Sequence, residues 1–414
     1  EAHQAPETAS RFFSLTVSAR QVQDLCRDFL AESGEVSGAL GTLREPVADC
    51  LQKLQEIQSA IAERMPDRGA WSELLNDDVT RAGLQALDQA VIALAEESGR
   101  LEGSARGMDG CIERARTLRA AFDRFDAPEA SGEVRWFERR GRGFGLHVTP
   151  LDVSEVFQSY RDELDAAWIF TSATLSVNDK FEHFARRLGL EDANTLKLDS
   201  PFDFHNHALF YVPEGLPEPA HGSYTDTMLD HAEQIIRASR GRTFVLFTSY
   251  RALNIAQRRL KDSCEFPLLV QGSAPRNELL QRFRELGNAV LLGTSSFWEG
   301  VDVRGEALSC VIIDKLPFAS PGDPVWQARI DALKERGGNP FIEEQLPHAV
   351  ITLKQGVGRL IRDVNDRGVL VICDPRLVSK SYGKVFLNSL PDMKRTRDFS
   401  EVVAFFQASD VARL

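Results

Sequence analysis

Residues 289–302 read AVLLGTSSFWEGVD, and this stretch decides the fold class. Its first four residues form an uninterrupted apolar run, which is typical of a strand buried on both faces of a parallel sheet. Small, hydroxyl and acidic residues follow directly. In open α/β sheets the loops after the carboxyl ends of the strands carry the ligands. The stretch therefore predicts a parallel sheet with a functional loop at one edge.

The same pattern of short apolar runs continues on both sides of this stretch. Buried strands are expected at 166–170, 208–212, 243–247, 268–271, 289–292, 310–313 and 369–373. Amphipathic helices are expected between them, at 224–239, 249–263, 275–286 and 323–336. This alternation of strands and helices predicts an α/β fold from about residue 165 onward.

The first third of the chain differs, because its apolar residues recur at spacings of three and four. Leu51, Leu54 and Ile57, for example, would share one helical face. No strand is expected between about 15 and 125, so the prediction is an antiparallel helical bundle or arch with these residues in its core. Residues 134–149 then predict a β-hairpin with a basic, glycine-rich tip, which would be a phosphate contact or a solvated turn.

Composition narrows the class of protein. The chain holds 61 acidic and 49 basic residues, a net charge of −12, which excludes a generally basic DNA-coating protein but not a local basic groove. No apolar run reaches the roughly 18 residues of a membrane span. The six cysteines form no C-x-x-C pair, so no metal site is expected within the chain. Without a signal-peptide pattern, the expected location is the cytoplasm.

Two short loops after predicted strands are rich in hydroxyl groups. Residues 171–175 read TSATL and residues 248–250 read TSY. Such hydroxyls can cap the helix that follows, or they can bind phosphate groups of a ligand or nucleic acid. Taken alone, each loop leaves both interpretations open.

The loop at 293–302 is more specific. It combines two glycines, three hydroxyl side chains, two adjacent aromatic residues and the carboxylates of Glu299 and Asp302. This concentration favours a functional loop, although two carboxylates also suit acid–base hydrolysis or a metal. Phe297 and Trp298 could stack on bases or pack in the core.

A fourth signal is the sequence QGVGRLIRD at 355–363, in which Arg359 and Arg362 are three residues apart. On a helix the two arginines would share a face. Two guanidinium groups directed at one point suit the negative charge that develops during phosphoryl transfer. The alternative is a surface cluster with Asp363 and Asp366.

In this order, the loops resemble the motifs of superfamily 2 DNA helicases of the XPD/DinG type, and the bacterial DinG/YoaA branch is the most similar. Motif III resembles 171–174, motif IV 247–250, motif V 293–302 and motif VI 355–362. The sequence DPR at 374–376 is also in keeping with this group. The resemblance covers about 140–414, and the helical first third fits the arch insertion of the family.

Residues 1–3, Glu-Ala-His, are similar to the end of a D-E-A-H box, which is motif II and precedes the arch in this family. The resemblance implies that the sequence begins inside motif II. It contains no G-x-x-x-x-G-K-[ST] phosphate loop. The implied cofactors are ATP, Mg²⁺ and a 4Fe-4S cluster in the parent protein, and the ligands of that cluster would lie upstream of this chain.

The family resemblance also implies a domain plan with two RecA-like motor domains, of which the first is incomplete. Residues 1–12 would end the first motor domain, 13–139 would form an all-helical arch, and 140–207 would complete the first motor domain. Residues 208–414 would form the second motor domain, with motifs IV, V and VI.

The resemblance further implies roles in ATP hydrolysis. Glu1 would orient the attacking water, and His3 would couple the site to motif III. Arg359 and Arg362 would act as arginine fingers. The implied nucleotide-binding residues, which sense the nucleotide or link its state to the grip on DNA, are Gln355, Gly358, Glu299, Gly300 and Asp302.

The implied substrate is single-stranded or forked DNA. The candidate DNA contacts are Ser172, Thr174, Ser249, Tyr250 and Thr294. Hydroxyl and backbone contacts to phosphate need no net positive charge. The YoaA-like branch implies one protein partner, the χ subunit of DNA polymerase III, bound through 395–414. No contact with a membrane is expected.

The resulting hypothesis is an ATP-dependent 5′–3′ DNA helicase of repair or replication, of which this chain is the C-terminal portion. By itself the chain is expected to be inactive, and the alternative function is a non-catalytic module that binds DNA or a partner. A nuclease built on Glu299 and Asp302 is a third possibility, disfavoured because no further carboxylate or His joins them at metal-site spacing.

Overall fold

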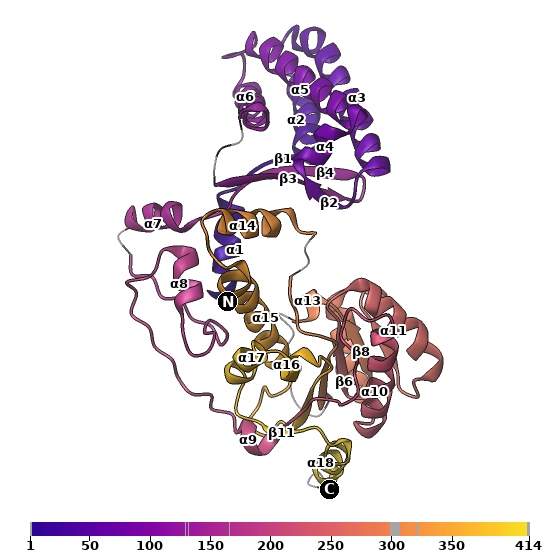
Figure 1. The fold of residues 1–414 in the computed structure, drawn as a ribbon. Coiled ribbons are helices and arrows are strands. Elements are labelled where there is room, and N and C mark those ends of the chain that lie inside the picture. The colour runs from indigo at the N-terminus through magenta and orange to yellow at the C-terminus, as the bar shows by residue number, and fades with distance from the viewer. Residues whose placement is uncertain are drawn as a thin grey trace.

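A computed structural model describes residues 2–128, 130, 132–164, 166–298, 307–319 and 322–411. Two bodies lie at opposite ends of the molecule in Figure 1. The helical body is formed by the first third of the chain, and the second body, which contains a large parallel sheet, is formed by the C-terminal half. Helices α1 (Ala5–Phe12), α7 (Ser154–Asp162), α8 (Glu182–Leu188), α14 (Pro324–Glu335) and α15 (Leu346–Val357) lie between them. In the described part of the chain, no helix is both long and apolar enough to cross a membrane.

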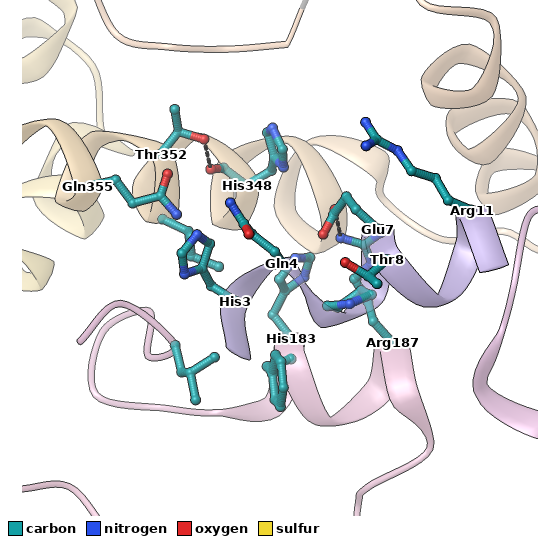
Figure 2. A pocket seen from close by; sticks show the side chains of 14 residues that line it. His3, Gln4, Glu7, Thr8, Arg11, His183, Arg187, His348, Thr352 and Gln355 are labelled. Atoms are coloured by element: carbon teal, nitrogen blue, oxygen red, sulfur yellow. Dashed lines mark hydrogen bonds and ion pairs between the residues drawn. The ribbon is translucent and has the colours of Figure 1, made fainter. Parts of the chain in front are cut away.

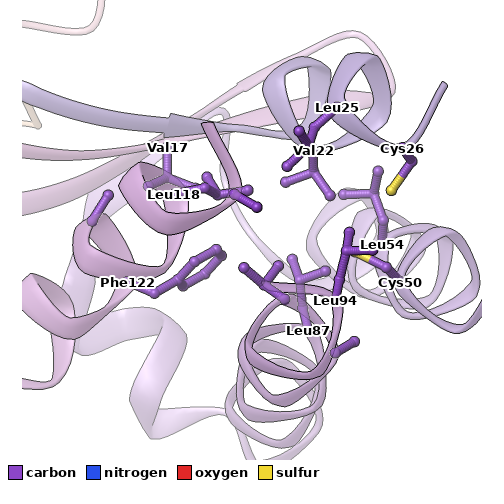
Figure 3. Packing of buried hydrophobic residues seen from close by; sticks show 14 of the residues in the cluster. Val17, Val22, Leu25, Cys26, Cys50, Leu54, Leu87, Leu94, Leu118 and Phe122 are labelled. Atoms are coloured by element: carbon purple, nitrogen blue, oxygen red, sulfur yellow. The ribbon is translucent and has the colours of Figure 1, made fainter. Parts of the chain in front are cut away.

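The helical body confirms the expected bundle. Its helices are α2 (Ala19–Glu32), α3 (Ala39–Arg64), α4 (Trp71–Asn76), α5 (Asp78–Gly99) and α6 (Arg106–Asp126). Apolar residues at helical spacing, among them Leu54, Leu87 and Phe122, meet in one core between α2, α3, α5 and α6 (Figure 3). Ser18 starts α2 with a capping box, in which its hydroxyl accepts from the Gln21 backbone and the Gln21 side chain accepts from the Ser18 backbone.

The prediction that no strand lies between about 15 and 125 is wrong. A four-stranded antiparallel sheet closes the base of the helical body in the order β1-β4-β3-β2. Its strands are β1 (Leu15–Ser18), β2 (Arg68–Ala70), β3 (Glu133–Arg140) and β4 (Gly143–Pro150). β1 and β2 are too short to show a period in the sequence, and their partners follow more than 60 residues later. Long-range pairing therefore forms strands that local pattern does not reveal.

The hairpin expected at 134–149 is confirmed as β3 and β4. Arg140 pairs with Gly143, so Gly141 and Arg142 form a two-residue turn. Gly141 has a φ of +60°, the backbone region that such a turn requires at its first position. The proposed boundary between 139 and 140 therefore falls within one hairpin.

The second body confirms the α/β prediction. Its seven-stranded parallel sheet has the order β11-β5-β10-β9-β6-β8-β7. Six of these strands lie at predicted positions, namely β5 (Ala208–Tyr211), β6 (Thr243–Leu246), β7 (Leu268–Val270), β8 (Val290–Gly293), β9 (Cys310–Ile313) and β10 (Gly368–Ile372). The seventh, β11 (Lys394–Thr396), is short and polar and was not predicted.

Helices cover both faces of this sheet, which is why its strands are apolar on both sides. One core lies between the sheet and α12 (Arg276–Leu286), α15 and α17 (Gly383–Ser389). The other lies between the sheet and α10 (Tyr224–Ala238), α11 (Tyr250–Ser263) and α18 (Phe399–Val411). The carboxyl ends of β6, β8, β9 and β10 lie together at one edge, because neighbouring strands are parallel and in register.

The strand expected at 166–170 is absent. These residues belong to no strand, and Ile169 is 84% exposed. A parallel strand needs neighbours to satisfy its backbone, and none of the described strands lies beside this segment. An apolar run alone was therefore insufficient evidence for a strand at this position.

Candidate functional site

A cavity of about 330 Å³ lies where α1, α8 and α15 meet. His3 and Glu7 approach it from the start of the chain, His183 and Arg187 from α8, and Gln355 from α15. Figure 2 shows these side chains facing one another across the cavity from three separate segments. Two motif residues that are 352 positions apart in sequence, His3 and Gln355, therefore line one cavity.

His3 contacts the loop identified with motif III. Its Nδ1 lies 3.3 Å from the Ser172 hydroxyl. Ser172 Oγ in turn lies 3.3 Å from Thr174 Oγ1 and accepts from the Thr174 backbone N–H at 3.3 Å. Thr174 is buried. The two candidate DNA contacts of this loop are thus joined to each other and to His3.

Gln355 is buried, with 5% of its surface exposed, and its Oε1 has no hydrogen-bond partner among the described residues. A buried amide oxygen without a partner costs free energy unless a ligand or water supplies a donor. Because Gln355 lines the cavity, the arrangement fits a polar ligand or an ordered water at this wall. An unpartnered buried oxygen of this kind is expected where a bound molecule completes a site.

The helical arrangement expected for the two arginines is wrong. Helix α15 ends at Val357, so Arg359 and Arg362 lie in the turn beyond it and share no helical face. Arg359 is only 7% exposed and donates its Nε–H to the Trp298 carbonyl at 2.9 Å. The Asp366 carboxylate accepts the backbone N–H groups of Arg362 and Asp363.

Gly358 follows the helix directly and is exposed, with its N–H donating to the Lys354 carbonyl. Neither Gly358 nor the two arginines line the cavity that contains His3 and Gln355. Four further predicted residues, Glu1, Glu299, Gly300 and Asp302, lie outside the described residues.

The aromatic pair of motif V packs in the core. Phe297 and Trp298 are both almost completely buried, and this excludes the base-stacking interpretation for this conformation. A Cβ at Gly293 would lie 2.8 Å from Cβ of Phe297, and a Cβ at Gly356 would lie 2.8 Å from the Trp298 ring. The glycines of motifs V and VI therefore make room for these two rings.

The remaining candidate DNA contacts are linked by Gln271, which the sequence did not single out. Its Oε1 accepts from the Thr294 backbone at 2.6 Å and from the Thr294 hydroxyl at 3.1 Å. Its Nε2 donates to the Tyr250 hydroxyl at 2.7 Å. Tyr250 is 60% exposed, whereas the neighbouring Ser249 caps α11 by accepting from the Ala252 backbone. Gln271 is the last residue of the strand predicted at 268–271, whereas in the structure it directly follows β7 (Leu268–Val270).

Two buried carboxylates hold the loops at the carboxyl edge of the sheet. Asp314 accepts from the Thr248 backbone at 3.0 Å and from the Lys315 backbone at 2.7 Å. Burial raises the pKa of Asp314 to about 7. Asp374 accepts from the Leu316 backbone and is paired with Arg376 at 2.7 Å. These contacts fix the motif IV loop against the loops that follow β9 and β10.

Charges gather at the other end of the cavity. Arg187 and Glu7 form an ion pair at 2.7 Å. The pKa of Glu7 is below its usual value although burial opposes this, because Arg187 lies beside it. Burial lowers the pKa of His183 and of His348 to about 4, and the positive charge of Arg187 adds to this effect. Both imidazoles are therefore neutral near pH 7.

This pair of histidines predicts a loss of stability in mild acid. In the unfolded chain they take up protons near pH 6.5, whereas in the folded chain they do so only near pH 4. The free energy of unfolding should therefore fall by up to about 3 kcal/mol for each histidine as the pH drops between these values. Urea unfolding from pH 7 to 4.5 measures it. The double variant His183→Gln/His348→Gln should show a clearly flatter dependence, and an unchanged slope would contradict the assignment.

The described residues contain no cluster of three or more His, Cys, Asp or Glu side chains that could hold a metal. The six cysteines are free thiols in separate elements. They do not fit a 4Fe-4S cluster, which needs four thiolates converging on one point.

Comparisons with known proteins find similarity to helicases. A family model described as a helicase C-terminal domain matches residues 232–393. The chain is 41% identical over 411 residues to the ATP-dependent DNA helicase YoaA of Haemophilus influenzae, covering 98% of this chain and 64% of that protein. It is 38% identical over 264 residues to the ATP-dependent helicase DinG of Mycobacterium tuberculosis, covering 63% of this chain and 40% of that protein.

The fold has a solved counterpart in the structure of Xpd4 from S. tokodaii, with a TM-score of 0.58 and 16% identity over 96% of this chain and 74% of that one. At this identity the likeness concerns the fold alone. The chain spans just under two thirds of the length of the YoaA helicase that it matches.

Proposed function

Because the chain belongs to the XPD/DinG-type superfamily 2 helicases, we propose that it forms the C-terminal portion of an ATP-dependent 5′–3′ DNA helicase. The observation that carries the proposal is the cavity shared by His3 and Gln355. His3 contacts the motif III loop, and Gln355 offers a buried oxygen without a partner. This arrangement supports a nucleotide-responsive site lined by residues of motifs II and VI, with motif III joined to it through His3.

In this proposal the domain plan follows the sequence resemblance. The body with the parallel sheet, 208–414, is the second motor domain, the helical body is the arch, and 1–12 with 151–207 belong to the first motor domain. The end of the arch moves from 139 to Pro150, because β4 pairs with β1 and β3 of the helical body. The exposure of Ile169 supports the assignment to the first motor domain, because an apolar segment at the start of motif III would be covered by the remainder of that domain.

The proposed chemistry is hydrolysis of ATP with Mg²⁺, and the nucleotide supplies the γ-phosphoryl group that water attacks. Gln355 Oε1 accepts a hydrogen bond from that water or from its neighbours, while Glu1 orients it. His3 holds the Ser172 hydroxyl and so links the site to motif III. Arg359 and Arg362 stabilise charge on the γ-phosphate. Arg359 is fixed by the Trp298 carbonyl, so a change in motif V repositions it.

Nucleotide binding by motifs V and VI is proposed to include Gly358, Glu299, Gly300 and Asp302. The DNA path is proposed to run over Ser172 and Thr174 on one motor domain and over Ser249, Tyr250 and Thr294 on the other. Tyr250 is the best placed for stacking on a base, because its ring is largely exposed while its hydroxyl is held by Gln271.

The partners and setting are proposed from the relatives. Single-stranded or forked DNA is the expected substrate, since the similar proteins carry the name DNA helicase. The χ subunit of DNA polymerase III is proposed to bind through 395–414, and a 4Fe-4S cluster is proposed for the segment upstream. The resemblance to bacterial helicases supports action in the cytoplasm, where bacterial DNA lies.

DNA-stimulated ATPase activity tests the proposal. We expect the 414-residue chain alone to bind single-stranded DNA without hydrolysing ATP, because its sequence contains no phosphate loop. The full-length helicase should hydrolyse ATP, and single-stranded DNA should stimulate it. Activity in the short chain would contradict the division into portions. DNA binding without ATPase activity in either form would favour the non-catalytic module.

A further inference from the structure

Lys354 precedes Gln355 on α15 and contacts a segment far away in the sequence. Its Nζ donates to the Ser176 carbonyl at 2.7 Å and to the Ser176 hydroxyl at 3.2 Å. Ser176 is buried, and Lys354 itself is half-buried. The contact therefore joins the helix of motif VI to the end of the loop that carries motif III.

The two ends of that loop are held by different partners. At its start, Ser172 is bonded to Thr174 and lies beside His3. At its end, Ser176 is bound twice by the Lys354 ammonium group. Gln355, the next residue of α15, lines the same cavity as His3. One turn of α15 thus contacts both the cavity and the loop of candidate DNA contacts.

The position of the ammonium group is unusual for a lysine. The pKa of Lys354 is lowered to about 8, chiefly by burial; Asp179 opposes this effect and Lys197 adds to it. Asp179 and Lys197 are themselves an ion pair, so Asp179 is already partly neutralised. A lysine without a structural role keeps its ammonium group in water, because burial disfavours the charged form. Its two bonds to Ser176 offset that cost.

We propose that Lys354 is a positioning residue that makes the motif III loop move together with the motif VI helix, and so couples DNA contact to the nucleotide cavity. The inference rests on the proposed helicase function and deepens it, because none of the helicase motifs includes this lysine. DNA bound at the more exposed start of the loop, beside Ser172, would shift the loop. The Lys354–Ser176 bonds would carry that shift to Gln355, one residue along the helix.

The test compares three variants of the full-length helicase. Lys354→Met removes the donor and keeps the length of the side chain. Lys354→Arg keeps the charge. Lys384→Met is the matched control, because Lys384 is an exposed lysine on α17 of the same body. For each, ATPase rates are measured with and without single-stranded DNA from pH 7 to 9, together with hydrogen exchange at 171–177.

The expected result is a loss of stimulation in Lys354→Met. The DNA-dependent increase in ATPase rate should fall about tenfold, as for the loss of a charged hydrogen bond, with faster exchange at 171–177. Lys354→Arg should retain most of the stimulation. In the wild type, stimulation should decline as the pH rises through about 8, while Lys354→Arg should not show this decline, because a guanidinium stays protonated.

Other outcomes separate this inference from the proposed function. Full stimulation in Lys354→Met, or equal loss in Lys384→Met, would overturn the coupling role while leaving the helicase proposal intact. A wild-type enzyme that hydrolyses ATP without any response to DNA would overturn both. Loss of stimulation with unchanged exchange at 171–177 would overturn the claim that Lys354 acts through this loop.

Discussion

Arg359→Ala should reduce ATP turnover by the full-length helicase about a thousandfold or more, which is the effect typical of removing an arginine finger. Arg359 has the features of a residue that is held ready for such a role. Its side chain is almost buried, and its Nε–H is fixed on the Trp298 carbonyl, so this anchor sets the direction of the planar guanidinium. Steady-state ATPase with saturating DNA measures the effect.

Two controls separate catalysis from folding. Arg359→Lys keeps a positive charge but cannot hold the Trp298 carbonyl and a phosphate together, so it should recover little activity. Single-stranded DNA binding should remain largely intact in both variants, because no proposed DNA contact involves Arg359. Loss of the hydrogen bond to Trp298 should by itself cost about 1.5–3 kcal/mol of stability, because its donor is charged. If Arg359→Ala instead unfolds the second body, the arginine is structural and the catalytic assignment fails.

The sequence predicts an element of the fold well when the residues of that element alone determine it, and poorly when distant partners do. Most strands of the parallel sheet were predictable, because a strand that is buried on both faces consists of consecutive apolar residues. The same run at 166–170 gave a wrong prediction, since the pattern records apolarity but not the presence of a neighbouring strand. β1 and β2 were missed for the opposite reason. They are segments of four and three residues that become strands only through distant partners.

The candidate site shows the same division. Motif resemblance selected His3, Ser172 and Gln355, and the structure brings His3 and Ser172 into contact and places Gln355 on the same cavity. The motif resemblance could not select Gln271 or Lys354, because each of them acts through a partner on another element. The prediction that the two arginines share a helical face is wrong because α15 ends at Val357. The ends of helices are the positions that a sequence determines least well.

Trp298→Ala should destabilise the second body by about 3–5 kcal/mol, since it removes a large, buried aromatic side chain. The ring lies between motif V and α15 and packs against Gly356. If Trp298 stacked on DNA bases instead, the variant would lose affinity for single-stranded DNA with little change in stability. Hydrogen exchange at β8 and α15, measured without DNA, separates the two outcomes.

A double-mutant cycle with Gly356 makes this test sharper. Gly356→Ala alone should cost about 1–3 kcal/mol, because its Cβ would lie 2.8 Å from the Trp298 ring and either the ring or the helix must shift. In the Trp298→Ala background the same Cβ meets only Ile313 Cδ1, at an ordinary contact distance of 3.5 Å. The substitution should then be neutral, or stabilise α15 by up to about 1 kcal/mol, because alanine favours a helix more than glycine does. The two substitutions should therefore be strongly non-additive. If Gly356→Ala costs the same in both backgrounds, the glycine is not needed to accommodate the Trp298 ring. The link between motifs V and VI would then have to pass through Arg359.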